Sequence, residues 1–294
     1  MTPKARSFPL MVALLAALAA APAAGCGGDD DGSSTSNNPT GGGGSGGTGA
    51  GGGGGGTPAL GDHLLITELM VSPDPGEFVE IWNPTSAEVD LSDHYISDNG
   101  AYFRIANGEA WLPSGTPGTD FLAQFPAGTR LAAGASLVLA ANPGFEAEHM
   151  RCADFALTTA AVTCSTGSTP PMVAPQNGGL GDQSSLLTND GEMVILFQWS
   201  GVVGEPVKDV DYVVWGTTAA GASEYVDKTG QTGYQPDTAT ADQLRAPTPP
   251  TGQSIERCMI EPGELAADGN GLTGHDETSE QLDQSFVLQT TPSA

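Results

Sequence analysis

The sequence predicts an all-β domain with two long loop insertions, preceded by a disordered linker. Short apolar runs recur with strand-like alternation, turn formers separate them, and no segment keeps a long helical period. The 294 residues include 42 glycines and 22 prolines, which also disfavours a helical bundle. This pattern indicates a sandwich or a barrel, and we interpret residues 59–294 as one β-sandwich.

The first two expected strands are Leu64–Val71 and Glu77–Asn83. Alternation in the second strand places Val79 and Ile81 on the core face and the side chains between them on the opposite face. Asn83 precedes a proline and is expected to end the strand. Further strands are expected at Val89–Leu91, Tyr95–Ser97, Tyr102–Ile105 after an Asn99-Gly100 hairpin turn, Ser136–Ala141, Met193–Trp199, Val210–Trp215, Ser254–Cys258 and Phe286–Leu288.

Two stretches, about 142–190 and 217–252, are long and poor in strand signals. Loops of this length are unusual inside a compact domain, so we interpret both as insertions on one sandwich. Loops at the ends of a sandwich often carry recognition, and these two are the expected contact surfaces.

Residues 1–25 are typical of an export signal peptide. Lys4 and Arg6 precede an apolar stretch that is too short to be a membrane span. The following small residues and Cys26 resemble a bacterial lipobox, although Ala23 stands where that pattern prefers leucine. The resemblance implies lipidation of Cys26, and Gly27 after it implies the outer membrane. The alternative is an ordinary signal cleaved after Ala24, which leaves Cys26 as a thiol.

Residues 26–58 then form a Gly/Ser-rich tether, expected to be disordered with a mean reach of about 30 Å. Its Gly-x-Gly strings have no strand before them and no helix after them, so they do not predict a dinucleotide site. The tether would hold the domain clear of lipid headgroups.

The formal net charge is -26, from 9 basic and 35 acidic residues. Nucleic-acid binding needs cations that replace the counterions of the phosphates, so nucleic acid is an unexpected partner. The same charge disfavours docking onto anionic lipid. Such a surface supports solubility and can attract cations, but it does not define a function.

Several ordered blocks resemble the lamin-tail domain family and together cover most of residues 62–290. The blocks are Leu65–Leu69, Glu77–Pro84, Val89–Leu91, Leu131–Leu139, Asn189–Leu196 and Ser254–Arg257. The resemblance implies an immunoglobulin-like β-sandwich. It also implies a module that in bacteria decorates secreted and surface proteins, sometimes beside nuclease or hydrolase domains.

Three cysteines remain if Cys26 is lipidated. Export to an oxidising space predicts that Cys152 and Cys164, which lie in one insertion, form a disulfide. Cys258 lies in an apolar strand and is expected to be a buried thiol, although its pairing with either of the other two stays open.

Residues 59–294 lack Gly-x-Ser-x-Gly, the chain has no HExxH, and its four histidines are scattered, so we expect neither an enzyme nor a zinc site. The alternative is a surface hydrolase with carboxylates from Glu68, Glu77, Glu80 and Asp276. On the first view, Glu77 and Glu80 are structural.

The glycine-rich stretch Asp268–Glu280 is the best candidate for an ion site. Asp268, Asn270 and Asp276 have the spacing of part of a Ca²⁺ loop, which would make a Ca²⁺-stabilised domain a third hypothesis. The competing interpretation is an exposed acidic turn before the last strand. No other cofactor is expected.

The leading hypothesis is therefore a non-catalytic surface lipoprotein. Its partners would be the membrane, through the lipid anchor, and a protein or glycan bound by the insertions. We expect it in a bacterial cell envelope, at the outer membrane or cell surface.

Overall fold

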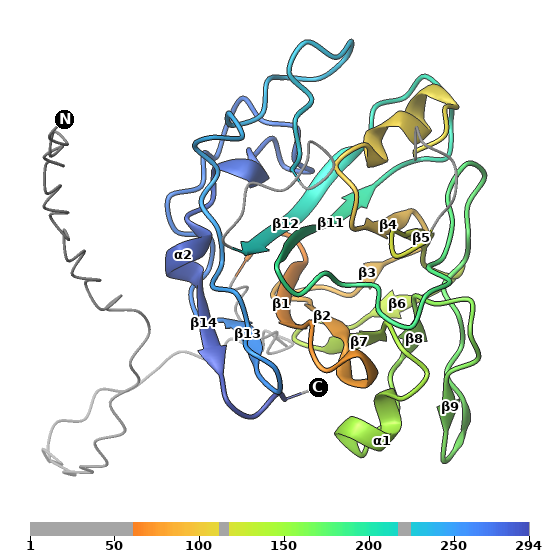
Figure 1. Ribbon diagram of the computed structural model, residues 1–294. Coiled ribbons are helices and arrows are strands. Elements are labelled where there is room, and N and C mark those ends of the chain that lie inside the picture. The colour runs from red at the N-terminus through yellow and green to blue at the C-terminus, as the bar shows by residue number, and fades with distance from the viewer. Residues whose placement is uncertain (1–60, 112–117, 217–224, 294) are drawn as a thin grey trace, which may run out of the picture.

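The computed structural model describes residues 61–111, 118–216 and 225–293 (Figure 1). The expected signal peptide, Cys26 and the tether lie outside the described residues, and so does the beginning of the second insertion at 217–224. Within the described ranges, no helix combines the length and apolarity that a bilayer crossing requires.

Two main sheets pack face to face and confirm the predicted all-β, immunoglobulin-like sandwich (Figure 1). The larger sheet is antiparallel except where β7 pairs with β8. Its order is β14 (Phe286–Gln289), β13 (Ser254–Arg257), β1 (Leu65–Met70), β2 (Phe78–Trp82), β7 (Ser136–Ala140) and β8 (Phe155–Ala156). The smaller sheet has the order β12 (Lys208–Gly216), β11 (Gly191–Gln198), β4 (His94–Ser97) and β5 (Leu122–Gln124).

The remaining elements are short. Two ribbons pair β3 (Val89–Asp90) with β6 (Arg130–Leu131) and β9 (Thr163–Cys164) with β10 (Gly167–Ser168). The helices are α1 (Phe145–His149) and α2 (Leu282–Ser285), and the 3-10 turns are η1 (Asp74–Gly76), η2 (Tyr102–Asn107) and η4 (Glu277–Ser279).

The main core lies between the sheets and follows the alternation of the strands. Val79 and Ile81 are fully buried in it, as predicted, whereas Phe78 packs in a second cluster on the outer face of the larger sheet. A register shift between Ile66 and Glu68 lets both Ile66 and Leu69 enter the main core.

The predicted strand Tyr102–Ile105 is wrong, because this segment is the 3-10 turn η2. The Asn99 side chain accepts a hydrogen bond from the Ala101 amide at 2.9 Å, and the Tyr102 amide donates to the Asn99 carbonyl at 3.0 Å. These local bonds start a helical turn, and the turn buries Tyr102 and Ile105 in the core.

The two insertions lie on different sides of the sandwich. Residues 142–190, mostly green in Figure 1, contain α1 and β8–β10 and occupy the right and bottom of the view. The described part of the second insertion, 225–252, lies at the top and left. It is joined to β12 by the bridge between Trp215 and Ala246.

Candidate functional site

A group of acids and histidines, with His63 and Glu277 buried within it, joins the start of the domain to its C-terminal segment. We call it the acid–histidine cluster, and its members are Asp62, His63, Glu261, Glu264, His275 and Glu277. His63 comes just before β1, and the glutamates follow β13. The tertiary fold therefore brings together residues that are almost 200 positions apart.

His63 is the centre of one half of the cluster. Its Nδ1 lies 2.7 Å from Oδ1 of Asp62, and its Nε2 lies 2.5 Å from Oε1 of Glu261. The same Nε2 is 3.9 Å from Oε2 of Glu277. Only 1% of the His63 side chain is exposed, so both ring nitrogens are held by carboxylates in a nearly dry environment.

His275 and Glu264 form the other half. Nδ1 of His275 is 3.1 Å from Oε2 of Glu264, and the two histidine rings meet edge to face with centroids 5.7 Å apart. The Glu264 side chain is 6% exposed, and its other oxygen, Oε1, is buried without an N–H or hydroxyl donor among the described residues.

Glycines let the loop that carries His275 fold against the cluster. A Cβ on Gly271 would lie 2.5 Å from Oε1 of Glu277, and a Cβ on Gly269 would collide with the backbone of His275. The Gly271 amide donates to the His275 carbonyl at 2.8 Å, which closes the loop. Glycine is therefore required here by close approach of the backbone.

The pKa values in the cluster reflect burial together with a surplus of carboxylates. Burial alone would lower the pKa of His63, but the hydrogen bond and charge of Glu261 raise it to about 9. Burial, and then the charge of Glu261, raise the pKa of Glu264 to about 7. Burial and the charge of Glu264 raise the pKa of Glu277 well above its ordinary value.

Arg257 balances the acids beside the cluster. Its Nη2 contacts both carboxylate oxygens of Asp211 at 2.9 and 3.0 Å, and its Nη1 contacts Glu280 at 2.5 Å. Its guanidinium also lies over the Phe286 ring, 4.7 Å from the centroid. This arginine is committed to two carboxylates and is not available to neutralise the cluster.

The candidate Ca²⁺ residues have different hydrogen-bond partners in the structure. Asn270 donates to the Gln235 carbonyl and to Asp237, whereas the Asp276 carboxylate accepts bonds from Thr238 and Thr278. Asp268 is exposed. Asn270 and Asp276 thus serve different hydrogen-bond networks.

The alternative of an exposed acidic turn is wrong for the second half of that stretch. Asp276, Glu277 and Glu280 are 6%, 4% and 3% exposed. They are buried because the loop folds back: the Asp276 amide donates to the Leu265 carbonyl, and the Arg257 guanidinium holds Glu280.

The carboxylates of the hydrolase hypothesis each accept hydrogen bonds from different donors. Glu68 accepts from Ser254 and Ser293, Glu80 accepts from Thr67, and Asp276 is bonded as described above. Glu68 and Glu80 are cross-strand neighbours.

Glu77 instead closes the end of the first insertion. Its carboxylate accepts from the Ser185 hydroxyl at 2.6 Å and from the Leu186 amide at 2.7 Å. Burial raises its pKa to about 7 despite these donors. These bonds give Glu77 a structural role.

Cys152 and Cys164 form a disulfide, as expected, and it closes the end of the first insertion. The sequence left open a pairing of Cys258 with Cys152 or Cys164, and this disulfide excludes it. The expected buried thiol at Cys258 is wrong on both counts, because this residue follows the last residue of β13, is exposed and is disulfide-bonded.

The interpretation of the histidines as scattered is wrong for two of the four. His63 and His275 lie together, while His94 is buried in β4 and His149 ends α1. The sequence does contain a signal for this cluster: a histidine just precedes the β1 segment and several acids follow the β13 segment, and they meet because β13 pairs with β1.

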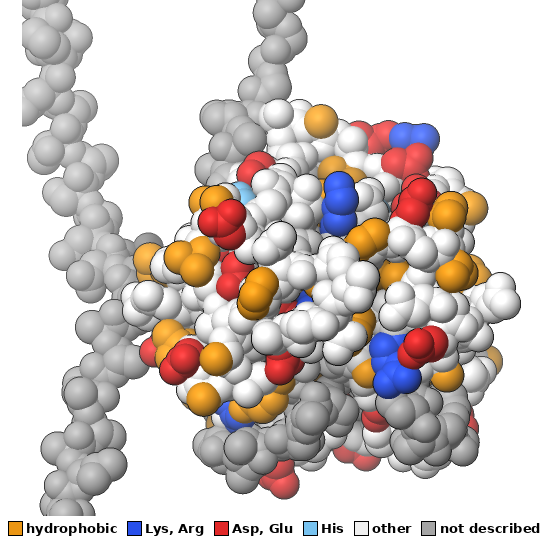
Figure 2. Space-filling view, turned by 90° about the horizontal axis from the view of Figure 1, so that it is seen from above, with side chains coloured by type: hydrophobic (Ala, Val, Ile, Leu, Met, Phe, Trp, Pro, Cys, Tyr) orange, Lys and Arg blue, Asp and Glu red, His pale blue; other side chains and the backbone are white. Residues whose placement is uncertain are grey.

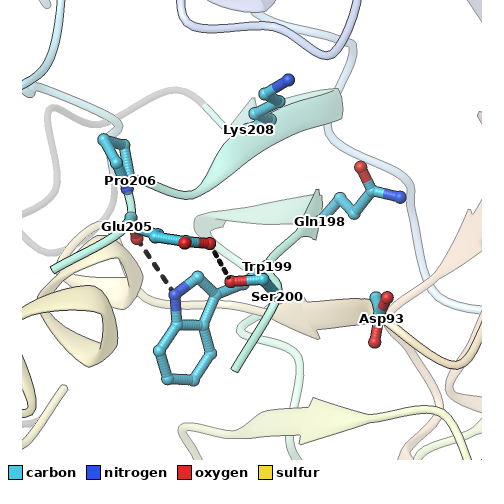
Figure 3. A pocket seen from close by; sticks show the side chains of 7 residues that line it. All are labelled: Asp93, Gln198, Trp199, Ser200, Glu205, Pro206 and Lys208. Carbon is cyan, nitrogen blue, oxygen red and sulfur yellow. Dashed lines mark hydrogen bonds between the residues drawn. The ribbon is translucent and has the colours of Figure 1, made fainter. Parts of the chain in front are cut away.

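The surface carries two adjoining hollows around Trp199. One has a volume of about 270 Å³ and is lined by Asp93, Gln198, Trp199, Ser200, Glu205, Pro206 and Lys208 (Figure 3). Trp199 Nε1 donates to the Glu205 carbonyl at 3.1 Å, and the Ser200 hydroxyl donates to its carboxylate at 2.6 Å. These bonds fix one wall.

The second hollow, of about 490 Å³, shares Asp93, Trp199 and Ser200 with the first. Gln176 and Asn177 of the first insertion line its other side. Elsewhere on the surface, acidic and hydrophobic side chains are interspersed and basic ones occupy few places on the face in Figure 2.

Comparison with known proteins gives a family and one solved structure. The family described as Lamin Tail Domain matches residues 57–217. No curated protein matches the chain. A crystal structure of a DUF4876 family protein from Bacteroides thetaiotaomicron VPI-5482 is similar with 14% sequence identity and a TM-score of 0.38, covering 76% of this chain and 70% of that chain.

Proposed function

The chain belongs to the lamin tail domain family, and from this premise we propose that it is a cell-envelope lipoprotein whose sandwich is a non-catalytic binding module. The anchor would be a lipid on Cys26, and the Gly/Ser-rich stretch to residue 58 would be the tether. Because a single mature chain then combines anchor, spacer and sandwich, the domain would be displayed at the outer membrane or cell surface.

The observation that carries the binding role is the pair of adjoining hollows around Trp199. Their walls combine the end of β11 with residues of the first insertion, so a strand of the sandwich and a loop of the insertion face the same hollows. A small number of polar groups around a concave surface is the usual form of a ligand site.

The lining favours a neutral glycan as the partner. Gln176 and Gln198 offer amide groups, which both donate to and accept from sugar hydroxyls, whereas the amides of Gln124 and Asn177 already donate to the Ser92 and Gly108 carbonyls. A strongly anionic polysaccharide would be repelled by a chain with a net charge of -26. A protein partner is the competing outcome.

The anchor is tested by fractionation and mass spectrometry. In the native bacterium, the mature N-terminus should be a diacylglyceryl-modified Cys26, and Cys26→Ser should move the protein from the membrane to the soluble fraction. An unprocessed N-terminus, or a serine variant that stays in the membrane, contradicts the proposal.

The binding surface is tested by capture of neutral envelope polysaccharides on the immobilised full chain. Gln176→Ala combined with Gln198→Ala should weaken capture about tenfold, since each removes an amide from the hollows. Gln183→Ala is the matched control, because it is an exposed amide in the same insertion that does not line them. Equal capture by all three proteins would exclude this surface, and capture of protein alone would replace the glycan.

A further inference from the structure

The acid–histidine cluster presents three overlapping sets of metal-ligating atoms: one is Asp62, His63 and His275, and the other two share Glu277. Nε2 of His63 and carboxylate oxygens of Glu261 and Glu277 lie within 4.8 Å of one another. Glu264, His275 and Glu277 make a second set that meets the same limit. Glu277 belongs to both, so the two sets surround one small volume.

An unsatisfied group within the cluster points independently to a missing cation. Oε1 of Glu264 is buried in a side chain that is only 6% exposed, and no N–H or hydroxyl of the described residues donates to it; the neighbouring Glu277 can bond to Glu264 only when one of the two carboxyls is protonated. A buried carboxylate oxygen without a donor destabilises the folded state, because it has lost its hydrogen bonds to water and no protein donor replaces them. A bound cation would satisfy this oxygen.

The charges around the cluster lead to the same conclusion. Glu261, Glu264 and Glu277 converge there, and Arg257 is already paired with Asp211 and Glu280. Only the two histidines can offset the three glutamates among the described cluster residues. A divalent cation would replace protons on the glutamates and let all three be ionised.

We propose that the acid–histidine cluster binds one Zn²⁺, with His63, Glu261 and Glu277 as ligands and Glu264 completing the site. Imidazole nitrogen combined with carboxylate oxygen suits Zn²⁺, whereas Ca²⁺ takes oxygen ligands only. Ligand atoms about 2 Å from a tetrahedral ion lie about 3.3 Å from one another. Small side-chain shifts would therefore lengthen the 2.5 Å His63–Glu261 distance and shorten the 3.9 Å His63–Glu277 distance.

Asp62 and His275 have supporting positions. Asp62 bonds to Nδ1 of His63 and so leaves Nε2 directed at the glutamates. In many zinc sites, a carboxylate orients the ligand histidine in this way by bonding to the ring nitrogen that does not contact the metal. Asp62 is 56% exposed and His275 is 17% exposed, so this side offers the ion a way in. The ion would tie the residues before β1 to the segment after β13.

The test uses the full chain, purified without a histidine tag, stripped with EDTA and titrated calorimetrically with ZnCl₂. We expect one Zn²⁺ per chain and a higher melting temperature in Zn²⁺ than in EDTA. Glu277→Gln should weaken binding at least tenfold while keeping the side-chain volume. Glu148→Gln, an exposed glutamate outside the cluster, should bind as the parent does.

A second measurement uses the parent chain, so it does not require any variant to fold. Co²⁺ added to the stripped parent chain should give the intense visible absorption of a four- or five-coordinate site, and Zn²⁺ should abolish it. Weak six-coordinate absorption, binding of Ca²⁺ without Zn²⁺, or Zn²⁺ affinity unchanged in folded Glu277→Gln would each overturn the proposal.

Discussion

The core between the sheets and the polar layer beyond β12 are both buried, but by opposite chemistry. The core consists of aliphatic and aromatic side chains such as Ile81, Ile195 and Phe197. The polar layer, defined as Asp209 and Asp211 of β12 with Lys228, Asp237, Arg257, Glu280 and the acid–histidine cluster, is held by charge pairs.

Lys228 shows how the polar layer works. Its side chain is 0% exposed, and its Nζ lies 2.6 Å from Asp209, 3.1 Å from Asp237 and 2.9 Å from the Tyr102 hydroxyl. Removing one member of such a group leaves a buried charge unpaired, whereas removing an apolar side chain leaves only a cavity. The two regions should therefore fail in different ways.

The two regions also differ in their relation to the family. The match ends at residue 217, so most of the core strands lie inside it, while Lys228, Arg257 and most of the acid–histidine cluster lie after it. The C-terminal segment adds β13 and β14 to the larger sheet and brings its own charges with it.

The largest effect is expected for Lys228→Ala. It leaves Asp209 and Asp237 buried without their cation, and should lower the free energy of unfolding by about 4 kcal/mol. Urea denaturation of the full chain measures this. Lys208→Ala, on the exposed start of β12, is the control and should change little. A loss below about 1 kcal/mol at Lys228 would erase the distinction between the regions.

Ile81→Ala tests the core. The side chain is fully buried, so its removal should cost about 3 kcal/mol through lost burial and the cavity that remains. Urea denaturation at two pH values measures it, and the loss should be the same at both because no titrating group is removed. A strongly pH-dependent loss would show that the regions are coupled.

The polar layer should contribute a pH dependence, in the same direction as the raised pKa of Glu77 outside it. Folding raises the pKa of Glu264 from 4.5 to about 7, so the folded state holds an extra proton between these values. Stability should therefore fall as pH rises through this window, by on the order of 2 kcal/mol. Glu264→Gln should flatten this part of the curve, measured by urea denaturation in EDTA.

His63 extends the same trend to higher pH. Its pKa is raised from 6.5 to about 9, so its contribution is complete below pH 6.5 and is lost as pH rises through 9. The free energy of unfolding of Ile81→Ala, plotted against pH, should run parallel to that of the parent. Stability that increases between pH 5 and 9 would contradict both signs.

The smallest effect is expected for the exposed ion pairs that Arg130 of β6 makes with an acid in β3 and an acid just before it. Arg130 contacts Glu88 and Asp90 but is 55% exposed, so water and salt screen it. Arg130→Ala should change the free energy of unfolding by less than about 1 kcal/mol in a thermal melt. A loss of stability as large as that of Lys228→Ala would show that burial does not determine how much an ion pair contributes to the stability of this molecule.

The core strands could be read from the sequence because their signal is local. Expected runs at 64–71, 77–83, 136–141 and 210–215 overlap β1, β2, β7 and β12. The strand expected at Tyr102–Ile105 was wrong because three apolar residues among four fit a strand or a helical turn, and the hydrogen bonds from Asn99 decide between them.

The sequence by itself determined the apolar alternation, the turns and the local disulfide, because neighbouring residues specify each of them. Only the tertiary structure decided which charges are buried together. His63 and Glu261 are 198 residues apart, and Lys228 and Tyr102 are 126 apart. No periodicity encodes such pairs, because each depends on which strands lie side by side and on how much water the packing excludes.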